Sequence, residues 1–580
     1  MLYSELEAYF IERFGELLNK KTPDSYRVRY HNSLSILQEF HELIEGWQKR
    51  RIQSYETVSL CAKECIALLE ADQCLAFNSY DKGLFIKDIE DYISKLPDSK
   101  EKRECIYDLS SKVRYVSRKC VNENTGVYVK NLFDFILNEI SKPGDMDADH
   151  CYPKEMKVFD WATSVLCTEL LRLGYSKNHL YLKSNQLSKH ELTILELRNY
   201  FIAQKPSDYG VLFKMNATND VIGCKDAYGF TENADDVMRL LTNKSGYTPN
   251  KSFFNVGDGV LFRKFEVSAL DTYSAIKKAK AELAMLLDTL HLGVSTSDLM
   301  INNMVIVYTQ APTGYYSERR NSEYKLDGEY FNDPLLSVRL KNDIGKILES
   351  NYVKEDAKER LISALRHFRM ADSCTDIELR FINLWVALEF IFSSPVSNEN
   401  TFLRIKKHLV NVLCCSYVRR NVNYLEKMLI SDGAISEGDV LANMTDQDWN
   451  KLINNIHNKC AQYRLCCLKS HLHDESSISS YVSAHKTNLE WHISRIYRMR
   501  NELIHEAAIK QDIEAATSNL RFYLVLLLNQ IICYFSKADR EMVLSINDFF
   551  HEYENSMDVI EKTPSREYLL SYEYEHNLIK

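Results

Sequence analysis

Glycine and proline are both scarce in this chain, which contains 18 Gly and 10 Pro among 580 residues. These two residue types mark turns and interrupt helices, so their scarcity argues against an all-β protein with many tight turns. Hydrophobic residues make up 45% of the chain and charged residues 26%, a composition typical of globular proteins rather than of disordered ones. We therefore expect a mainly helical protein, long enough for several domains.

Long apolar runs are also missing. The longest, FYLVLLLNQIICYF at Phe522–Phe535, is too short to cross a bilayer and contains Asn529 and Gln530. It predicts a buried helix, and no membrane partner is expected. The first residues, MLYSELEAYFIERF, lack the basic segment and cleavage site of a signal peptide. The 15 cysteines are an odd number without a regular spacing, which predicts free thiols in a reducing cytoplasm.

A basic overall charge is absent as well, because the formal net charge is −9 and the pI about 6.0. This excludes an unspecific nucleic-acid coat, so any contact with RNA requires a local patch or groove. The glycine motifs G-x-x-x-x-G-K-[ST] and G-x-G-x-x-G, which hold phosphates, do not occur, nor does the nucleophile motif G-x-S-x-G. We expect no cofactor.

Hydrophobic periodicity divides the chain into three predicted regions. Residues 1–203 have apolar residues at three- and four-residue steps and are expected to form a helical sensor or regulatory region. Residues 204–334 contain three strand candidates and one long helix, which predicts a small α/β (α+β) domain. Within it, residues 311–334 lack periodicity and are expected to be a linker or mobile loop. Residues 335–580 are expected to form a bundle of four or five helices with an extra C-terminal segment.

Element boundaries follow from the same patterns. KPGDMDADHCYP, at 142–153, is expected to be a loop and a subdomain boundary. In the last region we expect helices at about 375–394, 399–429, 446–469, 486–505 and 512–535.

One cluster of cysteine and histidine residues is a candidate metal site. Cys460, Cys466, Cys467, His471 and His473 lie within the short stretch CAQYRLCCLKSHLH. All five side chains are able to ligate zinc, but their spacing matches no standard zinc motif. Adjacent cysteines are also typical of a helix interior, so we expect core packing and no metal.

The stretch RMRNELIHEA, at 498–507, combines arginine, asparagine and histidine with apolar residues. An arginine followed closely by a histidine is common by chance, and Arg360–His367 and Arg464–His471 show the same pattern. The spacing alone therefore carries little weight. Helical geometry adds information, because it places Arg498 with the polar residues on one side and Arg500 among apolar positions.

An arginine on an apolar face needs a partner, because burying an unpaired charge is costly. Three arrangements meet this need for Arg500. It pairs with a carboxylate, for which Glu389 in LWVALEF is the first candidate; it bridges to a second chain; or it holds a phosphate in a cleft. A buried arginine followed by a helix-capping His505 is the corresponding structural interpretation.

Two separated motifs together resemble a known family. RNELIH, at Arg500–His505, resembles the R-[polar]-x-x-x-H motif of HEPN-domain ribonucleases. RFINLWVALEFIF, at 380–392, resembles the first bundle helix of the Apea-like HEPN group, in which a Trp and a Glu stand in a similar W-x-A-L-E setting. The resemblance is confined to the C-terminal region, and it implies a HEPN-type helical bundle there.

The resemblance implies a metal-independent RNA endonuclease. The 2′-OH of RNA attacks its own adjacent phosphate and leaves 2′,3′-cyclic phosphate and 5′-hydroxyl ends, so DNA is not a substrate. Arg500 would bind the scissile phosphate and His505 would transfer the proton. Asn501 would orient His505 or the substrate, and Glu389 would orient Arg500 or Asn501. Arg498 is the rival phosphate contact on the polar side of the helix.

The resemblance also implies partners. Because the chain carries one convincing copy of the motif, an active enzyme requires a homodimer through the C-terminal bundle. RNA, with tRNA and mRNA as candidates, is the expected substrate. The implied role is that of a toxic effector in bacterial anti-phage defence by abortive infection, with a phage-derived trigger. The alternative is a non-catalytic HEPN bundle that binds nucleotide or protein and has a regulatory or structural role.

Overall fold

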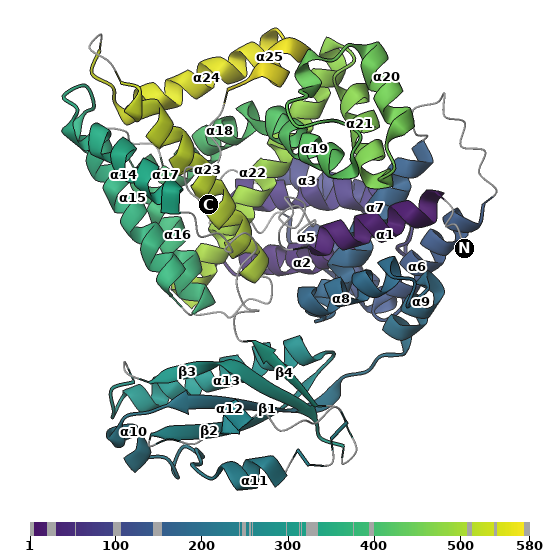
Figure 1. Cartoon of the computed structure of the whole chain (residues 1–580). Coiled ribbons are helices and arrows are strands. Elements are labelled where there is room, and N and C mark those ends of the chain that lie inside the picture. Colours follow the sequence, from purple (N-terminus) through teal and green to yellow (C-terminus); the bar gives the residue numbers. More distant parts are fainter. Residues whose placement is uncertain are drawn as a thin grey trace. The chain divides into compact units, whose positions relative to one another are not determined.

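The computed structural model describes residues 5–19, 31–52, 54–96, 106–142, 154–239, 241–242, 244–245, 251–254, 257, 259–296, 299–311, 314, 316–320, 334–374, 376–393, 400–506, 513–538 and 542–573. The chain divides into two compact units. Unit 1 contains Met1–Val165 and Leu326–Lys580, and unit 2 contains Leu166–Lys325. Helices dominate both the start and the end of the chain, and strands occur only in unit 2 among the described residues (Figure 1). The predicted fold class, mainly α with a small strand-containing middle, is confirmed.

Unit 2 is built on an antiparallel sheet with the strand order β2-β1-β3-β4. Its strands are β1 (Ser207–Asn216), β2 (Val260–Ala269), β3 (Met300–Thr309) and β4 (Tyr316–Arg320). Alternate side chains of β1 face opposite sides, so Val211 and Phe213 join one core and Leu212 joins another. The first core includes α13 (Thr272–His291), and the second includes Phe253 of α12. Both faces are covered, and the antiparallel pairing makes this an α+β unit.

The short helices of unit 2 flank the sheet strands in the chain. They are α8 (Lys177–Ser188), α9 (Ile194–Ala203), α10 (Asn219–Gly223), α11 (Ala234–Arg239) and α12 (Lys251–Phe254). Ser176 caps the N-terminus of α8, where its hydroxyl accepts the His179 N–H. Asp271 caps α13 and also accepts hydrogen bonds from the Ser176 N–H and hydroxyl, which ties the two helix N-termini together.

The predicted linker contains a strand. Residues 316–320 pair with β3 from Tyr308↔Tyr316 to Met304↔Arg320, so the prediction of a linker or mobile loop was wrong for β4. An edge strand with the sequence YSERR has no hydrophobic alternation, and only the pairing with β3 makes it a strand. Residues 321–333, the rest of this segment, lie outside the described residues, as do 143–153 of the predicted loop at 142–153.

The N-terminal part of unit 1 consists of helices. They are α1 (Glu5–Leu18), α2 (Ser33–Gln48), α3 (Tyr55–Ala71), α4 (Lys82–Lys95), α5 (Tyr107–Asn124), α6 (Tyr128–Ser141) and α7 (Lys154–Arg172), the last of which continues into unit 2. Helices α2–α5 share a core of buried side chains that includes Phe40, Trp47 and Tyr92. Asn32 caps α2 by accepting two backbone N–H groups, so this group of helices begins with a well-defined N-terminus.

The C-terminal part of unit 1 contains the bundle. Its elements are α14 (Pro334–Glu349), α15 (Glu355–Ser373), α16 (Ile377–Phe392), α17 (Thr401–Arg404), a π-turn (Ile405–Leu409), α18 (Val410–Cys415), α19 (Tyr417–Asp432), a 3₁₀ turn (Leu441–Asn443), α20 (Asp446–Asn455), α21 (Lys459–His471), α22 (Glu475–Glu506), α23 (Ile513–Ser536), α24 (Ile546–Lys562) and α25 (Arg566–Ser571). Helices α15, α16, α22 and α23 pack on one another around a shared apolar core.

Several predicted helices have other limits in the structure. The predicted helix 399–429 is divided into α17, the π-turn, α18 and α19, and the predicted helix 446–469 is interrupted at 456–458. Helix α22 begins at Glu475, earlier than predicted. Helices α16 and α23 match their predictions at 375–394 and 512–535. The break at 456–458 has a local cause, because Asn458 caps α21 by accepting the Ala461 N–H.

Helix α23 is the one described helix that is long and apolar enough to cross a membrane. Its most apolar window is 78% buried within unit 1, as expected of a core helix. The prediction that Phe522–Phe535 forms a buried helix is therefore confirmed.

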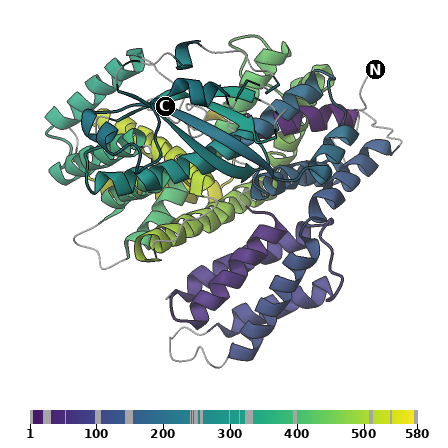
Figure 2. The same cartoon turned by 90° about the horizontal axis from the view of Figure 1, so that it is seen from below.

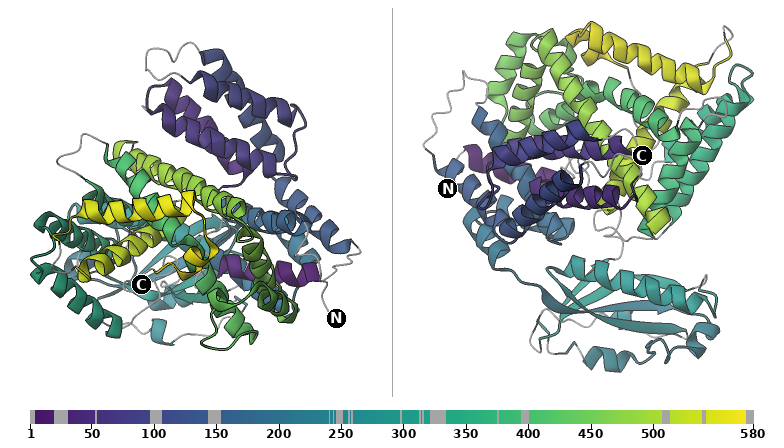
Figure 3. Two further views of the ribbon diagram at one scale, coloured as in Figure 1. Left: turned by 90° about the horizontal axis from the view of Figure 1, so that it is seen from above. Right: turned by 180° about the vertical axis from the view of Figure 1, so that it is seen from behind.

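The N-terminal and C-terminal helices belong to one unit. Figures 2 and 3 show α2–α5 lying along the long helix α22, and α1 contacts α21. The predicted boundaries after residues 203 and 334 differ from the observed divisions, which fall after Val165 and Lys325. The reason is physical: helices far apart in sequence share buried charged contacts, which no local pattern reveals.

Candidate active site

Arg500 lies near the end of α22 and contacts a carboxylate. Its Nη2 is 3.4 Å from Oε1 of Glu389 on α16, and its Nη1 donates a hydrogen bond of 3.2 Å to Oδ1 of Asn501. The Arg500 side chain is 23% exposed and that of Glu389 33%, so water reaches both. Of the three arrangements expected for Arg500, the structure shows the pairing with Glu389. In addition, Nε of Arg500 is buried and has no hydrogen-bond partner among the described residues.

The tryptophan of α16 fixes the position of Glu389. Trp385 is buried, and its Nε1 donates a 2.7 Å hydrogen bond to Glu389 Oε1, the same oxygen that faces Arg500. The Trp385 ring packs 5.7 Å from the ring of Tyr497 on α22, which in turn stacks on Phe402 at 4.1 Å. Trp385 and Glu389 lie one helical turn apart on α16, so the buried indole holds the carboxylate in position toward α22. We call Trp385, Glu389, Arg500 and Asn501 the Arg500 cluster.

The predicted catalytic histidine lies next to this cluster in the chain. His505 belongs to the last turn of α22, but its side chain lies outside the described residues, as do residues 507–512. Asn501, predicted to orient His505 or the substrate, is half-buried and bonded to Arg500. The structure therefore brings together Arg500, Asn501 and Glu389 of the predicted site.

Arg498 is buried and paired with a carboxylate, so it does not lie on an accessible face of α22. It is 7% exposed and its Nη2 donates to Oε1 of Glu39 on α2. Arg498 was expected on the polar side of the helix and Arg500 on the buried side, yet Arg498 is the more buried of the two. The expectation was wrong because α2 and α3, distant in sequence, cover this side of α22. A carboxylate already neutralises Arg498, which removes the rival phosphate contact from the candidate site.

Arg498 belongs to a buried charge network between α22 and the N-terminal helices. Arg495, which is 3% exposed, contacts Oε2 of Glu39 at 3.1 Å and also pairs with Glu64 on α3. His31 lies 2.6 Å from Glu39 through its Nε2. Burial disfavours the charge of Glu39, but Arg498 and the other cations outweigh it and hold the pKa of that carboxyl well below its usual range. We call His31, Glu39, Glu64, Arg495 and Arg498 the α22 charge network.

Sequence reasoning missed Arg495, Glu39 and Glu64. One signal was available, because arginines at i and i+3 among the apolar residues of α22 share a face that needs carboxylates. The identity of those carboxylates was not accessible, since they lie more than 400 residues earlier in the chain.

Next to this network, His492 makes the stability of unit 1 pH-dependent. Burial lowers the pKa of His492 to about 3, and its Nδ1 lies 2.6 Å from the Tyr523 hydroxyl. Between about pH 6.5 and pH 3, only the unfolded chain binds a proton at this residue, so stability falls as the pH is lowered. The Glu39 contribution is complete above the ordinary glutamate pKa of 4.5 and decreases progressively as the pH falls from there toward the lowered folded pKa.

We predict that His492→Asn flattens this dependence. Between about pH 6.5 and pH 5, the slope of the unfolding free energy should decrease by up to about 1.4 kcal/mol per pH unit. Urea unfolding at several pH values measures this slope. His551→Asn is the control, because His551 is exposed. Equal slopes for His492→Asn and the unchanged chain would contradict the prediction. The remaining slope comes in part from His408, whose pKa burial lowers to about 4.

The chance pair Arg360–His367 has a structural explanation. Arg360 donates through Nη1 to the carbonyls of Phe390 at 3.3 Å and of Ser393, at the C-terminal end of α16. An arginine there satisfies carbonyls that lack helical partners. His367 contacts Asn383 Oδ1 at 3.1 Å through Nδ1. These contacts agree with the interpretation that this pair is not a second active-site motif.

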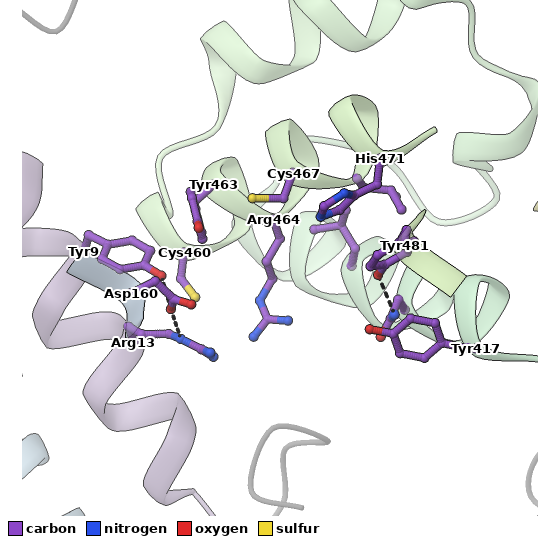
Figure 4. A pocket seen from close by; sticks show the side chains of 13 residues that line it. Tyr9, Arg13, Asp160, Tyr417, Cys460, Tyr463, Arg464, Cys467, His471 and Tyr481 are labelled. Carbon is purple, nitrogen blue, oxygen red and sulfur yellow. Dashed lines mark hydrogen bonds and ion pairs between the residues drawn. The ribbon is translucent and has the colours of Figure 1, made fainter. Parts of the chain in front are cut away.

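A pocket of about 170 Å³ lies in unit 1 between α1, α7, α19, α21 and α22, and it contains three of the candidate metal ligands. In Figure 4, Arg13 and Arg464 point into the same space, which Cys460, Cys467 and His471 line from α21. Each arginine has a carboxylate: Arg13 Nε lies 2.6 Å from Asp160 Oδ1, and Arg464 Nη2 lies 3.0 Å from Glu16 Oε2. The pocket therefore carries opposite charges that neutralise each other.

The cysteines of this pocket are held as thiols. Cys460 Sγ donates to Glu16 Oε2 at 2.8 Å, and burial together with the Glu16 charge raises the pKa of that thiol well above its usual value. Burial raises the pKa of Cys467 to about 11. Metal binding requires thiolates. Cys466 is buried in the core and His473 is exposed, and the described residues contain no group of three or more ligands arranged around a metal.

Comparisons of the chain with models of protein families, with curated proteins and with solved structures found no match.

Proposed function

We propose that this protein is a metal-independent RNA endonuclease of the HEPN type, with the Arg500 cluster and His505 as its active site. The observation that carries the proposal is the partly exposed Arg500 guanidinium, held by Glu389 and Asn501 little more than one turn before His505. A guanidinium in this setting offers a planar set of donors to a phosphate. The motif resemblance of α16 and α22 supports the same assignment, since Glu389 of the first motif contacts Arg500 of the second and Trp385 donates a hydrogen bond to that glutamate.

In the proposed reaction, the 2′-oxygen of a ribose bonds to the adjacent phosphorus and the bond from phosphorus to the 5′-oxygen breaks. His505 accepts the proton of the 2′-OH or supplies one to the leaving 5′-oxygen. Arg500 stabilises the negative charge that accumulates on the phosphate oxygens. Glu389 keeps Arg500 in place, and its ion pair is weak enough for a phosphate to compete with it because both side chains are partly exposed. Products have 2′,3′-cyclic phosphate and 5′-hydroxyl ends.

The proposal includes an assembly and a biological role. One active-site motif per chain requires a homodimer through the C-terminal bundle, with both Arg500 clusters facing one cleft. Cleavage of tRNA or mRNA in the cytoplasm would stop growth of an infected bacterium, as in abortive infection. The N-terminal helices bind α22 through the α22 charge network and would transmit a phage-derived trigger to the active site.

One observation favours a second candidate function. The Arg500–Glu389 ion pair is already formed within the chain, which also suits a bundle that uses this contact only for stability. Such a bundle would bind nucleotide or a partner protein without cleaving RNA.

Cleavage of RNA in the presence of EDTA separates the two functions. Purified protein is expected to cut end-labelled single-stranded RNA or tRNA and to leave DNA of the same sequence intact. Replacing His505 by alanine should lower the cleavage rate by about 100- to 10,000-fold, because proton transfer is lost. Gel analysis with a phosphatase that removes only linear phosphates identifies the cyclic product ends.

His473→Ala is the matched control, since His473 is exposed and lies just before the N-terminus of α22, at the opposite end of that helix from His505. It should cleave at the unchanged rate. Light scattering should give a dimer for both variants. Full activity of the His505→Ala variant, or a requirement for a divalent metal, would exclude the proposed mechanism.

A further inference from the structure

A second pocket lies entirely within unit 2 and is larger, with a volume of about 410 Å³. Residues of α8 and α9, the N-terminal end of α13 and Arg319 of β4 line it. Ligand pockets typically measure about 300–1,000 Å³, so this one is large enough for a small organic molecule. We call it the unit 2 pocket.

Cationic groups dominate this pocket. Lys183 is half-buried, with its Nζ 4.1 Å from the centre of the Tyr200 ring, and no carboxylate of the described residues pairs with it. Arg319 lies over the ring of Tyr273 at 4.9 Å. Both cations are close enough to His179 to disfavour its protonation, in addition to the effect of burial, which lowers the pKa of His179. The positive charges of Lys183 and Arg319 therefore face the same part of the pocket.

Two acidic residues line this pocket, Glu191, which is exposed, and Asp271, which is already engaged. Asp271 is 2% exposed and accepts hydrogen bonds from Ser176, Tyr273 and Ser274 at the N-termini of α8 and α13. Its charge is satisfied by these donors and does not pair with Lys183. Burial without a carboxylate partner lowers the pKa of Lys183, an effect that a bound anion would reverse. Unlike Lys183, the two arginines of the unit 1 pocket have carboxylate partners, Asp160 for Arg13 (Figure 4) and Glu16 for Arg464.

The other residues that line the pocket indicate which further chemical groups an anionic ligand would carry. Asn185 and Gln186 of α8 contribute side-chain amides, each with donors and an acceptor, whereas the Gln204 amide nitrogen already donates to the carbonyls of Lys205 and Leu270. Tyr200 and Tyr209 contribute aromatic rings. A ligand with one phosphate, hydroxyl groups and a flat heterocycle matches this combination of cations, amides and rings.

We propose that the unit 2 pocket binds a nucleoside monophosphate, with Lys183 and Arg319 at its phosphate and the amides of α8 at its sugar or base. The inference is independent of RNA cleavage, since all of these residues lie in unit 2. A nucleoside 5′-monophosphate contains no internucleotide phosphate for a 2′-OH to attack, so binding is measurable without turnover.

Calorimetric titration of the full chain tests the proposal in phosphate-free buffer. The probes are inorganic phosphate, ribose 5-phosphate and adenosine and uridine 5′-monophosphates. The nucleotides are expected to bind more tightly than ribose 5-phosphate, and inorganic phosphate least tightly. Lys183→Met and Arg319→Met should each weaken nucleotide binding by about tenfold or more, because each removes a charged phosphate contact. Lys183→Arg, which retains the charge, should bind more tightly than Lys183→Met.

Lys278→Met is the matched control, because Lys278 is exposed on α13 and donates to the Ser268 carbonyl outside the pocket. It should bind the nucleotide with unchanged affinity. Hydrogen exchange of α8 and α9 should slow on addition of nucleotide in the unchanged chain. Absence of nucleotide binding, equal affinity for inorganic phosphate, or unchanged binding by both methionine variants would each overturn the proposal. Circular dichroism confirms that the variants are folded.

Discussion

Arg500→Ala is expected to lower the rate constant of RNA cleavage by about 100- to 1,000-fold, the loss typical of removing one donor to a transition-state anion. Stability should change by only about 1 kcal/mol, because the lost ion pair with Glu389 is partly exposed to water. Single-turnover cleavage with excess protein measures the rate, and urea unfolding measures the stability. Arg500→Lys should lie between alanine and arginine, since it restores the charge but not the planar set of donors.

Arg566→Ala is the matched control for this experiment. Arg566 pairs with Asp446 and its side chain is 27% exposed, close to the 23% of Arg500, but it lies on α25. It should cleave RNA at the unchanged rate. If Arg500→Ala and Arg566→Ala show the same activity, Arg500 is a structural residue and the second, non-catalytic function is favoured.

Arg495→Met is expected to destabilise unit 1 by about 3–5 kcal/mol, although Arg495 is absent from the proposed active site. The substitution keeps an unbranched side chain of related length but removes the cation that faces both Glu39 and Glu64. Glu64 is buried, so its carboxylate would be left in an apolar setting without this cation. Hydrogen exchange of α3 and α22 and urea unfolding of the full chain measure the loss.

A second substitution distinguishes a charge effect from a packing effect. Glu64→Gln in the Arg495→Met background removes the uncompensated charge and should recover part of the lost stability. A double variant that is less stable than Arg495→Met would show that packing, not the unpaired carboxylate, causes the loss. Lys112→Met is a suitable control, because Lys112 pairs with Asp88 on exposed surface and should change stability by at most about 1 kcal/mol.

Arg498 and Arg500 show which contacts a helical pattern in the sequence predicts and which it does not. Both arginines lie on α22, and their spacing placed them on different faces of the helix. Glu389 was the first candidate for one of three arrangements expected of Arg500, and the 3.4 Å contact shows that arrangement within the chain. The pattern assigned the wrong exposure to Arg498, because a surface that is polar in sequence becomes buried once α2 supplies Glu39.

The sequence by itself determined the helical character of the chain, the strands β1–β3 and the buried helix α23. These features depend on local periodicity and on residues a few positions apart, which interact wherever a helix or strand forms. The tertiary structure alone decided the edge strand β4, the joining of the N-terminal helices to the bundle in unit 1, and the neutralisation of Arg498. Each of these depends on partners that lie far away in the chain, or on an edge that another strand offers. These contacts stabilise the protein only after folding has brought the distant segments together.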